Sequence, residues 1–299
     1  MKFKRSVMIM MMLFLLGSCS LMPNKADEKK QGEPSAYIPV QDYTGQGYSF
    51  DNGEETGKFA NQHRKQIVEK VKQYFRQKYH LDITVHQIYG ATDAAVVFVE
   101  SKKDPKFHTS VIVGIDLENK KIGDVGAYEG SVEGAITTGL YVMAYKKEFQ
   151  KLDAFCTAIT KEYPVIGRTK EAVDHTASTG GFTTPYYYTS TSDLIFSEAY
   201  HAFLHKESYQ NIIHLIKQKP FDKEGMMITL TFFMEKKHSL PDKSIAKKVI
   251  DKLKKSNGLP PGNYGVYIKS NEILKRTGTA KKQEGTTSGV DDTILEPSK

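Results

Sequence analysis

Residues 226–234 read MMITLTFFM, an apolar run of nine residues rich in the β-branched and aromatic side chains that favour strands. Residues 243–255 read KSIAKKVIDKLKK, in which the apolar side chains repeat with the period of a helix. Asn257-Gly258 and Pro260-Pro261 predict the end of that helix, and a second strand is predicted from Tyr264 to Lys269. This order of strand, helix and strand indicates a sheet covered by helices.

The region before it shows the same kinds of pattern. Apolar side chains at helical spacing predict helices from Phe59 to Tyr79, Ser192 to Lys206 and Tyr209 to Gln218, and either one helix or two, broken near Lys146-Lys147, from Val132 to Lys161. Apolar β-rich runs predict strands from Ile83 to Tyr89, Ala94 to Glu100 and Phe107 to Leu117. Because the connections between these strands are short, they favour a meander. We expect an α+β fold with a mixed or mainly antiparallel sheet and helices packed on one face.

Composition divides the chain of 299 residues into parts. Residues 19–42 mix charged and small residues without periodicity and predict a flexible tether, and residues 276–299 predict a disordered tail. The segment between them, 43–275, predicts a single globular domain, with two subdomains meeting near 164–185 as the alternative.

The N-terminus has the order of a secretory signal. Lys2, Lys4 and Arg5 precede an apolar stretch from Val7 to Leu16, and small residues follow directly. The stretch of ten residues is too short for a membrane-spanning helix, which needs about 20. Residues 1–18 are therefore predicted to be a signal peptide, and its removal lowers the formal net charge from +7 to +4.

The tetrapeptide Leu16-Gly17-Ser18-Cys19 resembles the lipobox of bacterial lipoproteins. The resemblance implies cleavage between Ser18 and Cys19, a diacylglyceryl thioether on Cys19 and an acyl amide on the new N-terminus. It also implies a lipid-anchored protein on the extracytoplasmic face of the cell membrane, which argues against a nucleic-acid partner. An ordinary secreted protein with a chance cysteine is the alternative. The preference for Lys over Arg favours a Gram-positive host.

No standard catalytic motif is present. Residues 53–58 read GEETGK, which resembles a phosphate-binding loop, but the spacing between the two glycines is one residue too short. Glu198, His201 and His205 fall on one face of a predicted helix, where they could hold a metal ion, although exposed or core-edge histidines are the plainer interpretation. Cys156 lies on an apolar helix face and is expected to be buried and inert.

Two surface features could bind a partner. Tyr186, Tyr187 and Tyr188 follow a Gly/Pro loop and either line a recognition groove or alternate across a strand. Lys247 and Lys248 belong to one of two strongly basic helices, which either contact an anionic polymer or membrane surface or are solvated helix faces.

Several segments resemble a family of lipoproteins of staphylococci and bacilli whose activity is not established. The resemblance rests on residues 40–47, 97–101, 139–144 and 184–188. It implies a lipid-anchored surface protein and assigns no catalytic residue. We expect a non-enzymatic envelope protein that binds an envelope protein or an anionic polymer, with no cofactor beyond the lipid on Cys19. An extracytoplasmic hydrolase or metal-dependent enzyme using His201, His205 and Glu198 is the alternative.

Overall fold

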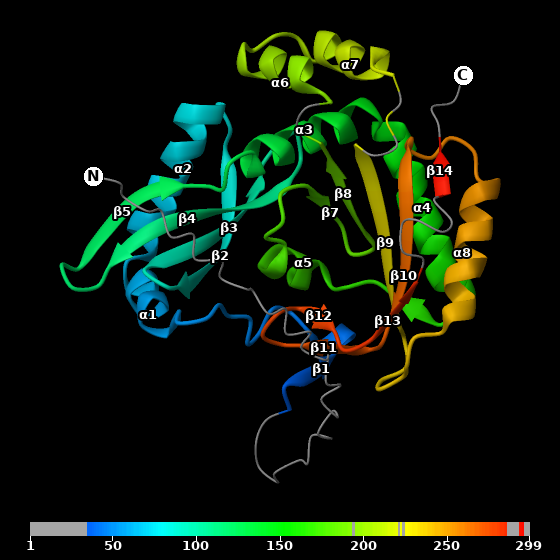
Figure 1. The fold of residues 1–299 in the computed structure, drawn as a ribbon, viewed down its shortest axis with the longest axis horizontal. Helices are drawn as coiled ribbons and strands as arrows, with labels where there is room; N and C mark the ends of the chain where they lie inside the picture. The colour runs from blue at the N-terminus through cyan, green and yellow to red at the C-terminus, as the bar shows by residue number, and fades with distance from the viewer. Residues whose placement is uncertain (1–34, 193–194, 221, 223–224, 286–292, 296–299) are drawn as a thin grey trace, which may run out of the picture. The chain divides into compact units, whose positions relative to one another are not determined.

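The computed structural model describes residues 35–192, 195–220, 222, 225–285 and 293–295. All the helices and strands described below lie in one compact unit that begins at Ala36. This unit has an α+β fold, as the sequence predicts (Figure 1).

The first half of the unit contains a four-stranded antiparallel meander. Its strands pair in the order β2 (Ile83–Ala91), β3 (Ala94–Ser101), β4 (His108–Asp116) and β5 (Lys121–Gly126). The first three confirm the predicted strands, whereas β5 was not predicted because its sequence, KIGDVG, has few apolar residues. Helices α1 (Glu54–Gln62) and α2 (Arg64–Tyr79) pack on this sheet, so the single helix expected from Phe59 to Tyr79 is in fact the end of one helix and the whole of the next.

The second half contains a seven-stranded mixed sheet. Its main path is β13 (Gln283–Gly285), β10 (Gly262–Lys269), β9 (Met226–Met234), β8 (Tyr187–Thr191) and β7 (Phe182–Thr183), while β14 (Thr293–Leu295) pairs with β10 and β6 (Val165–Ile166) pairs with β9. Strands β9 and β10 are parallel and are joined through α8 (Lys243–Lys255). The predicted bounds of β9 and α8 are confirmed.

The remaining helices connect and cover the two sheets. The helical stripe from Val132 to Lys161 is two helices, α3 (Ser131–Ala144) and α4 (Lys146–Glu162), which break at Tyr145. Helix α3 contacts β4, β7 and β8 on one side and α6 (Ser197–Leu204) and α7 (Tyr209–Gln218) on the other (Figure 1). The short helix α5 (Lys170–Thr176) packs on β2 and β3. No helix among the described residues is both long and apolar enough to span a bilayer.

The two faces of β9 differ, and this difference positions a cavity described below. Ile228, Leu230 and Phe232 are fully buried in the main hydrophobic core. Because side chains alternate along a strand, Thr231 and Phe233 lie on the opposite face.

The folded unit extends further at both ends than the sequence predicts. Strand β1 (Tyr37–Pro39) and the 3-10 helix η1 (Val40–Asp42) lie in the segment expected to be a tether, and β1 pairs with β11 (Glu272–Leu274). Strands β12 (Thr279–Ala280), β13 and β14 lie in the segment expected to be a disordered tail. These strands add to sheet edges through backbone hydrogen bonds, which need no apolar side-chain pattern. Residues 1–34, including Ser18 and Cys19, lie outside the described residues.

Candidate metal centre

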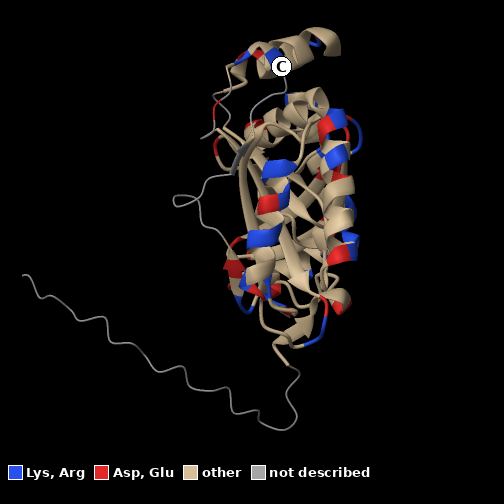
Figure 2. Cartoon of the chain, turned by 90° about the vertical axis from the view of Figure 1, so that its right-hand side faces the viewer, with Lys and Arg blue, Asp and Glu red and all other residues tan. Residues whose placement is uncertain are grey.

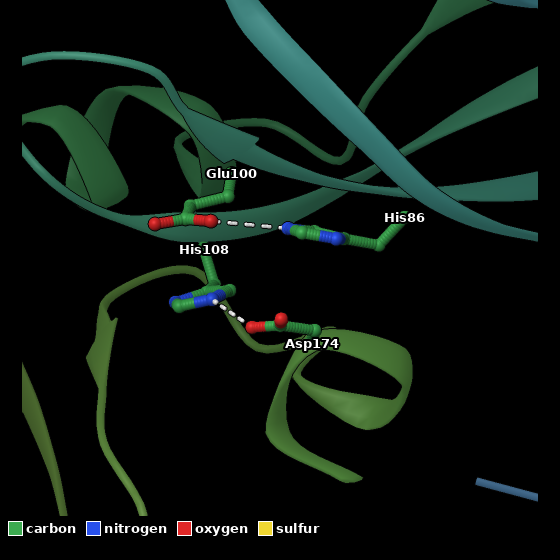
Figure 3. A group of neighbouring side chains, drawn as sticks. All are labelled: His86, Glu100, His108 and Asp174. Carbon is green, nitrogen blue, oxygen red and sulfur yellow. Dashed lines mark hydrogen bonds and ion pairs between the residues drawn. The ribbon is translucent and has the colours of Figure 1, made fainter. Parts of the chain in front are cut away.

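Two imidazoles and two carboxylates meet at one end of the four-stranded sheet. His86, Glu100, His108 and Asp174 each offer one ligand atom, and these four atoms all lie within 4.8 Å of one another (Figure 3). Two nitrogen and two oxygen atoms so arranged are a donor set that proteins use for first-row divalent metals.

Strand register brings three of the four residues together. Glu100 on β3 and His108 on β4 are directly paired, so their side chains leave the same face of the sheet. A bulge in β2 between Val85 and Gln87 leaves His86 out of the ladder. Bulges re-aim side chains, and that of His86 reaches Glu100.

Asp174 comes from α5, which lies on this face of the sheet. The helix begins after Thr169, whose hydroxyl oxygen accepts a hydrogen bond from the Ala172 backbone N–H at 3.0 Å. The backbone of His108 is also tied to Gly181 by two hydrogen bonds. Chain segments far apart in sequence therefore hold the four side chains.

Each carboxylate lies between one imidazole and one lysine. Glu100 Oε2 is 3.1 Å from His86 Nε2, and its Oε1 is 3.6 Å from Lys106 Nζ. Asp174 Oδ1 is 3.7 Å from His108 Nε2, and its Oδ2 accepts a hydrogen bond from Lys170 Nζ at 2.6 Å. The lysines thus orient the carboxylates from outside, as outer-shell partners of metal ligands do.

Of the four residues, His108 is the one whose ring nitrogens lack hydrogen-bond partners among the described residues. It is only 7% exposed, and neither of its ring nitrogens has a hydrogen-bond partner within the described part of the chain. Burial lowers the pKa of His108. A neutral imidazole can accept a metal ion without first losing a proton.

Glu100 is held in its charged form. The hydrogen bond from His86, with help from His108 and Lys106, lowers the pKa of Glu100 from 4.5 to about 2. A carboxyl group whose pKa is lower in the folded than in the unfolded protein stabilises the fold at pH values above its unfolded pKa. For Glu100 this stabilisation is lost as the pH falls from about 4.5 to about 2.

We therefore expect Glu100→Gln to reduce the stability difference between pH 7 and pH 3 by about 1–2 kcal/mol, after allowance for solvent screening. The comparison is urea unfolding of metal-free protein at both pH values, with the exposed Glu55→Gln as the matched control. Equal acid sensitivity of the Glu100→Gln and wild-type proteins would contradict the role given to this carboxylate.

The structure does not bring together the metal ligands proposed from the sequence. Helix α6 ends at Leu204, and His205 is its C-cap residue. Glu198 is paired instead with Lys219 at 3.2 Å. These three residues are not among the described His and carboxylate groups that come within ligand distance of one another.

The three tyrosines are divided between different surroundings. Tyr187 is buried, and its hydroxyl donates to Asp153 Oδ1 at 2.8 Å, whereas Tyr188 donates to Gly180 O on the other face of β8. Tyr186 packs near Phe232. Tyr187 and Tyr188 thus alternate across β8, and Tyr186 precedes the strand. Binding of a partner by these three residues stays a prediction.

Lys247 and Lys248 are exposed on α8, where lysines lie along the outer side of the helix (Figure 2). Lys248 Nζ lies 5.8 Å from the ring centroid of Tyr163. Their binding to an anionic polymer or membrane surface stays a prediction. Cys156 is fully buried, and burial raises the pKa of its thiol, as expected for an inert side chain.

None of the four residues of the candidate metal centre is predicted from the sequence. His86 and His108 are 22 residues apart with no motif between them, and Asp174 follows much later. The only local signal is that Glu100 and His108 are charged or polar residues at the ends of two apolar runs. Their proximity depends on strand register and on the placement of α5.

Comparisons with known proteins show the family and the fold. The sequence matches the family described as "Protein of unknown function (DUF1672)" over residues 30–296. The crystal structure of a DUF1672 family protein from Staphylococcus aureus is similar, with a TM-score of 0.67 and 19% identity, and the match covers 89% of this chain and 100% of that one. No curated protein matches the sequence. The predicted relationship to a staphylococcal family is thus confirmed at the level of family and fold: the chain belongs to the DUF1672 family.

Proposed function

We propose that this protein is a lipid-anchored bacterial surface protein whose domain binds one divalent metal ion through His86, Glu100, His108 and Asp174. Its role is that of a binding protein, with no catalytic residue assigned. The unpartnered imidazole of His108 is the observation that carries the metal site.

A buried polar group without a partner is unfavourable by roughly 1–3 kcal/mol, and most such groups are paired in folded proteins. His108 Nε2 lies 3.7 Å from Asp174 Oδ1, which is too long for a good hydrogen bond. A metal ion between these atoms would satisfy both of them. Such an ion would account for a buried imidazole that has no hydrogen-bond partner among the described residues.

The donor set favours Zn²⁺. Imidazole nitrogen and carboxylate oxygen are both ordinary Zn²⁺ ligands, and four protein ligands are typical of a structural site. Ca²⁺ and Mg²⁺ prefer oxygen ligands, so the two histidines select against them. Lys106 and Lys170 are exposed enough for solvent to screen much of their charge, so they oppose the ion only weakly.

The test is calorimetric titration of the metal-free mature chain, residues 19–299, with Zn²⁺, and with Ca²⁺ as the control ion. We expect one equivalent of Zn²⁺ to bind and to raise the melting temperature, and Ca²⁺ to do neither. A chain that binds no Zn²⁺, or that binds Zn²⁺ and Ca²⁺ alike, would contradict the proposal.

The lipid anchor is supported by the N-terminal sequence, in which a basic segment, a short apolar stretch and a small-residue pair precede Cys19. Two acyl chains or more are also what stable anchoring requires, since a single chain binds only marginally. The family shared with a staphylococcal protein is consistent with a Gram-positive host.

We expect Cys19→Ala to move the protein from the membrane fraction to the medium. Fractionation of the producing cells measures this, and mass spectrometry of the wild-type N-terminus should show diacylglyceryl on Cys19. Cys156→Ala is the matched control, because it removes a thiol that lies in the core and should leave the protein on the membrane. A soluble wild-type protein with a free Cys19 thiol would exclude the anchor.

A further inference from the structure

A polar cavity lies on the face of the mixed sheet opposite the main core. It has a volume of about 310 Å³, and Thr231 and Phe233 of β9 contribute to its floor together with Lys269 at the end of β10. Phe233 and Lys269 are directly paired in the parallel register. The walls come from Tyr48, Tyr188 and the segments after α5 and β11.

Two cationic side chains line this cavity, Arg168 and Lys269. Both are partly buried, and neither forms an ion pair with a carboxylate among the described residues. Both line the same cavity, and burial, followed by the positive charge of Arg168, lowers the pKa of Lys269 to about 8. Burial likewise lowers the pKa of Arg168.

This arrangement is unfavourable in the protein alone. A charged group withdrawn from water is normally paired, because its desolvation is otherwise uncompensated. Here two like charges share one cavity, and each opposes the other. An anion in the cavity would compensate both charges at once.

The rest of the lining is rich in hydroxyl groups. Those of Thr179, Thr183 and Thr231 make no hydrogen bond within the described part of the chain, so they are available to a ligand. Thr277 and Thr279 also line the cavity and share a hydrogen bond of 2.6 Å. Hydroxyl groups can donate and accept, which suits a ligand that itself carries hydroxyl groups.

We propose that this cavity binds a small phosphorylated polyol, with its phosphate between Arg168 and Lys269 and its hydroxyl groups against the threonines. A phosphomonoester carries a charge of about −1.5 to −2 at pH 7 and so matches two cations better than a carboxylate does. The planar guanidinium of Arg168 can bind two phosphate oxygens at once. The volume is near the lower end of ligand pockets, which favours a molecule of sugar-phosphate size over a nucleotide.

The experiment is isothermal titration of the full mature chain with glycerol 3-phosphate, with inorganic phosphate and glycerol as the two partial ligands. We expect glycerol 3-phosphate to bind most tightly and glycerol not to bind. Lys269→Met and Arg168→Met should each weaken binding of glycerol 3-phosphate by roughly tenfold or more, because each removes one charge-assisted contact. Lys254→Met, an exposed lysine of α8, is the matched control and should bind as the wild type does.

Thermal unfolding without ligand separates a binding role from a structural one. Because removal of an uncompensated cation relieves its desolvation and its repulsion of the other, ligand-free Lys269→Met should melt at the same temperature as the wild type or higher. Lower melting temperature of this variant would indicate that Lys269 supports the fold and would count against the site. No binding of glycerol 3-phosphate to the wild type, or equal binding to wild type and Lys269→Met, would overturn the proposal.

Discussion

The His108→Ala variant is expected to bind Zn²⁺ at least about a hundredfold more weakly than the wild type. Loss of an outer-shell partner already weakens metal sites by about 10–100-fold, and His108 is proposed as a direct ligand. The imidazole is neutral because burial lowers its pKa, and it comes from the first residue of β4, which backbone pairing with Gly181 holds in place. No other described imidazole besides His86 lies within ligand distance to replace it.

Stability measurements test Zn²⁺ binding by the same variant in a second way. At a free Zn²⁺ concentration of about 100 times the dissociation constant, the wild type should gain about 2.7 kcal/mol of unfolding free energy, and His108→Ala should gain almost none. His205→Ala is the matched control, since it removes an imidazole from the end of α6 and should leave Zn²⁺ binding unchanged. If His205→Ala lost Zn²⁺ and His108→Ala kept it, the assignment of the metal centre would be wrong.

The Gly90→Ala variant is expected to destabilise the fold by about 3 kcal/mol, because the added methyl group overpacks the site and only a shift of the backbone can make room for it. Gly90 is buried in β2, where α1 approaches the strand closely. A Cβ on Gly90 would lie 2.0 Å from Gly53 O and 2.3 Å from Gly57 N. Both neighbours are backbone atoms, so no side-chain rotation can remove the contact.

Gly126→Ala is the control for this prediction. Gly126 is an exposed strand residue of β5, and a Cβ there would have no atom within 4 Å. We therefore expect its unfolding free energy to change by less than about 0.5 kcal/mol, as is usual for surface substitutions. Urea unfolding of both variants measures the difference, and equal stability of the two would show that α1 does not approach β2 in this way. The result also accounts for the glycines at 53 and 57, which resemble part of a phosphate-binding loop but serve helix packing instead.

Elements that bury one long apolar face were predictable from sequence. The bounds of α7, β9 and α8 agree with the prediction, because in each the apolar residues recur at the period of the element from end to end. Strands β1, β5 and β12 to β14 were not predicted. They pair along sheet edges, where backbone hydrogen bonds hold them and side-chain pattern contributes little.

The candidate sites also differ in how far the sequence alone could predict them. The predicted metal site relied on helical spacing along α6, but Glu198, His201 and His205 are not among the described groups whose ligand atoms come together. The candidate metal centre instead joins a bulge in β2, the paired ends of β3 and β4, and a short helix. The separations between these four residues in the sequence follow no motif from which a single sequence could predict that they meet.

The sequence by itself therefore determined the α+β class and the central strands and helices, because each depends on residues close together in the chain. The signal peptide and the lipid anchor stay predictions. Only the tertiary structure decided where charge is concentrated. It brought His86 and His108 to two carboxylates, and it placed Arg168 and Lys269 in one cavity without a described acidic partner. Such sites arise from contacts between segments far apart in sequence, whose cost in desolvation appears only when the chain is folded.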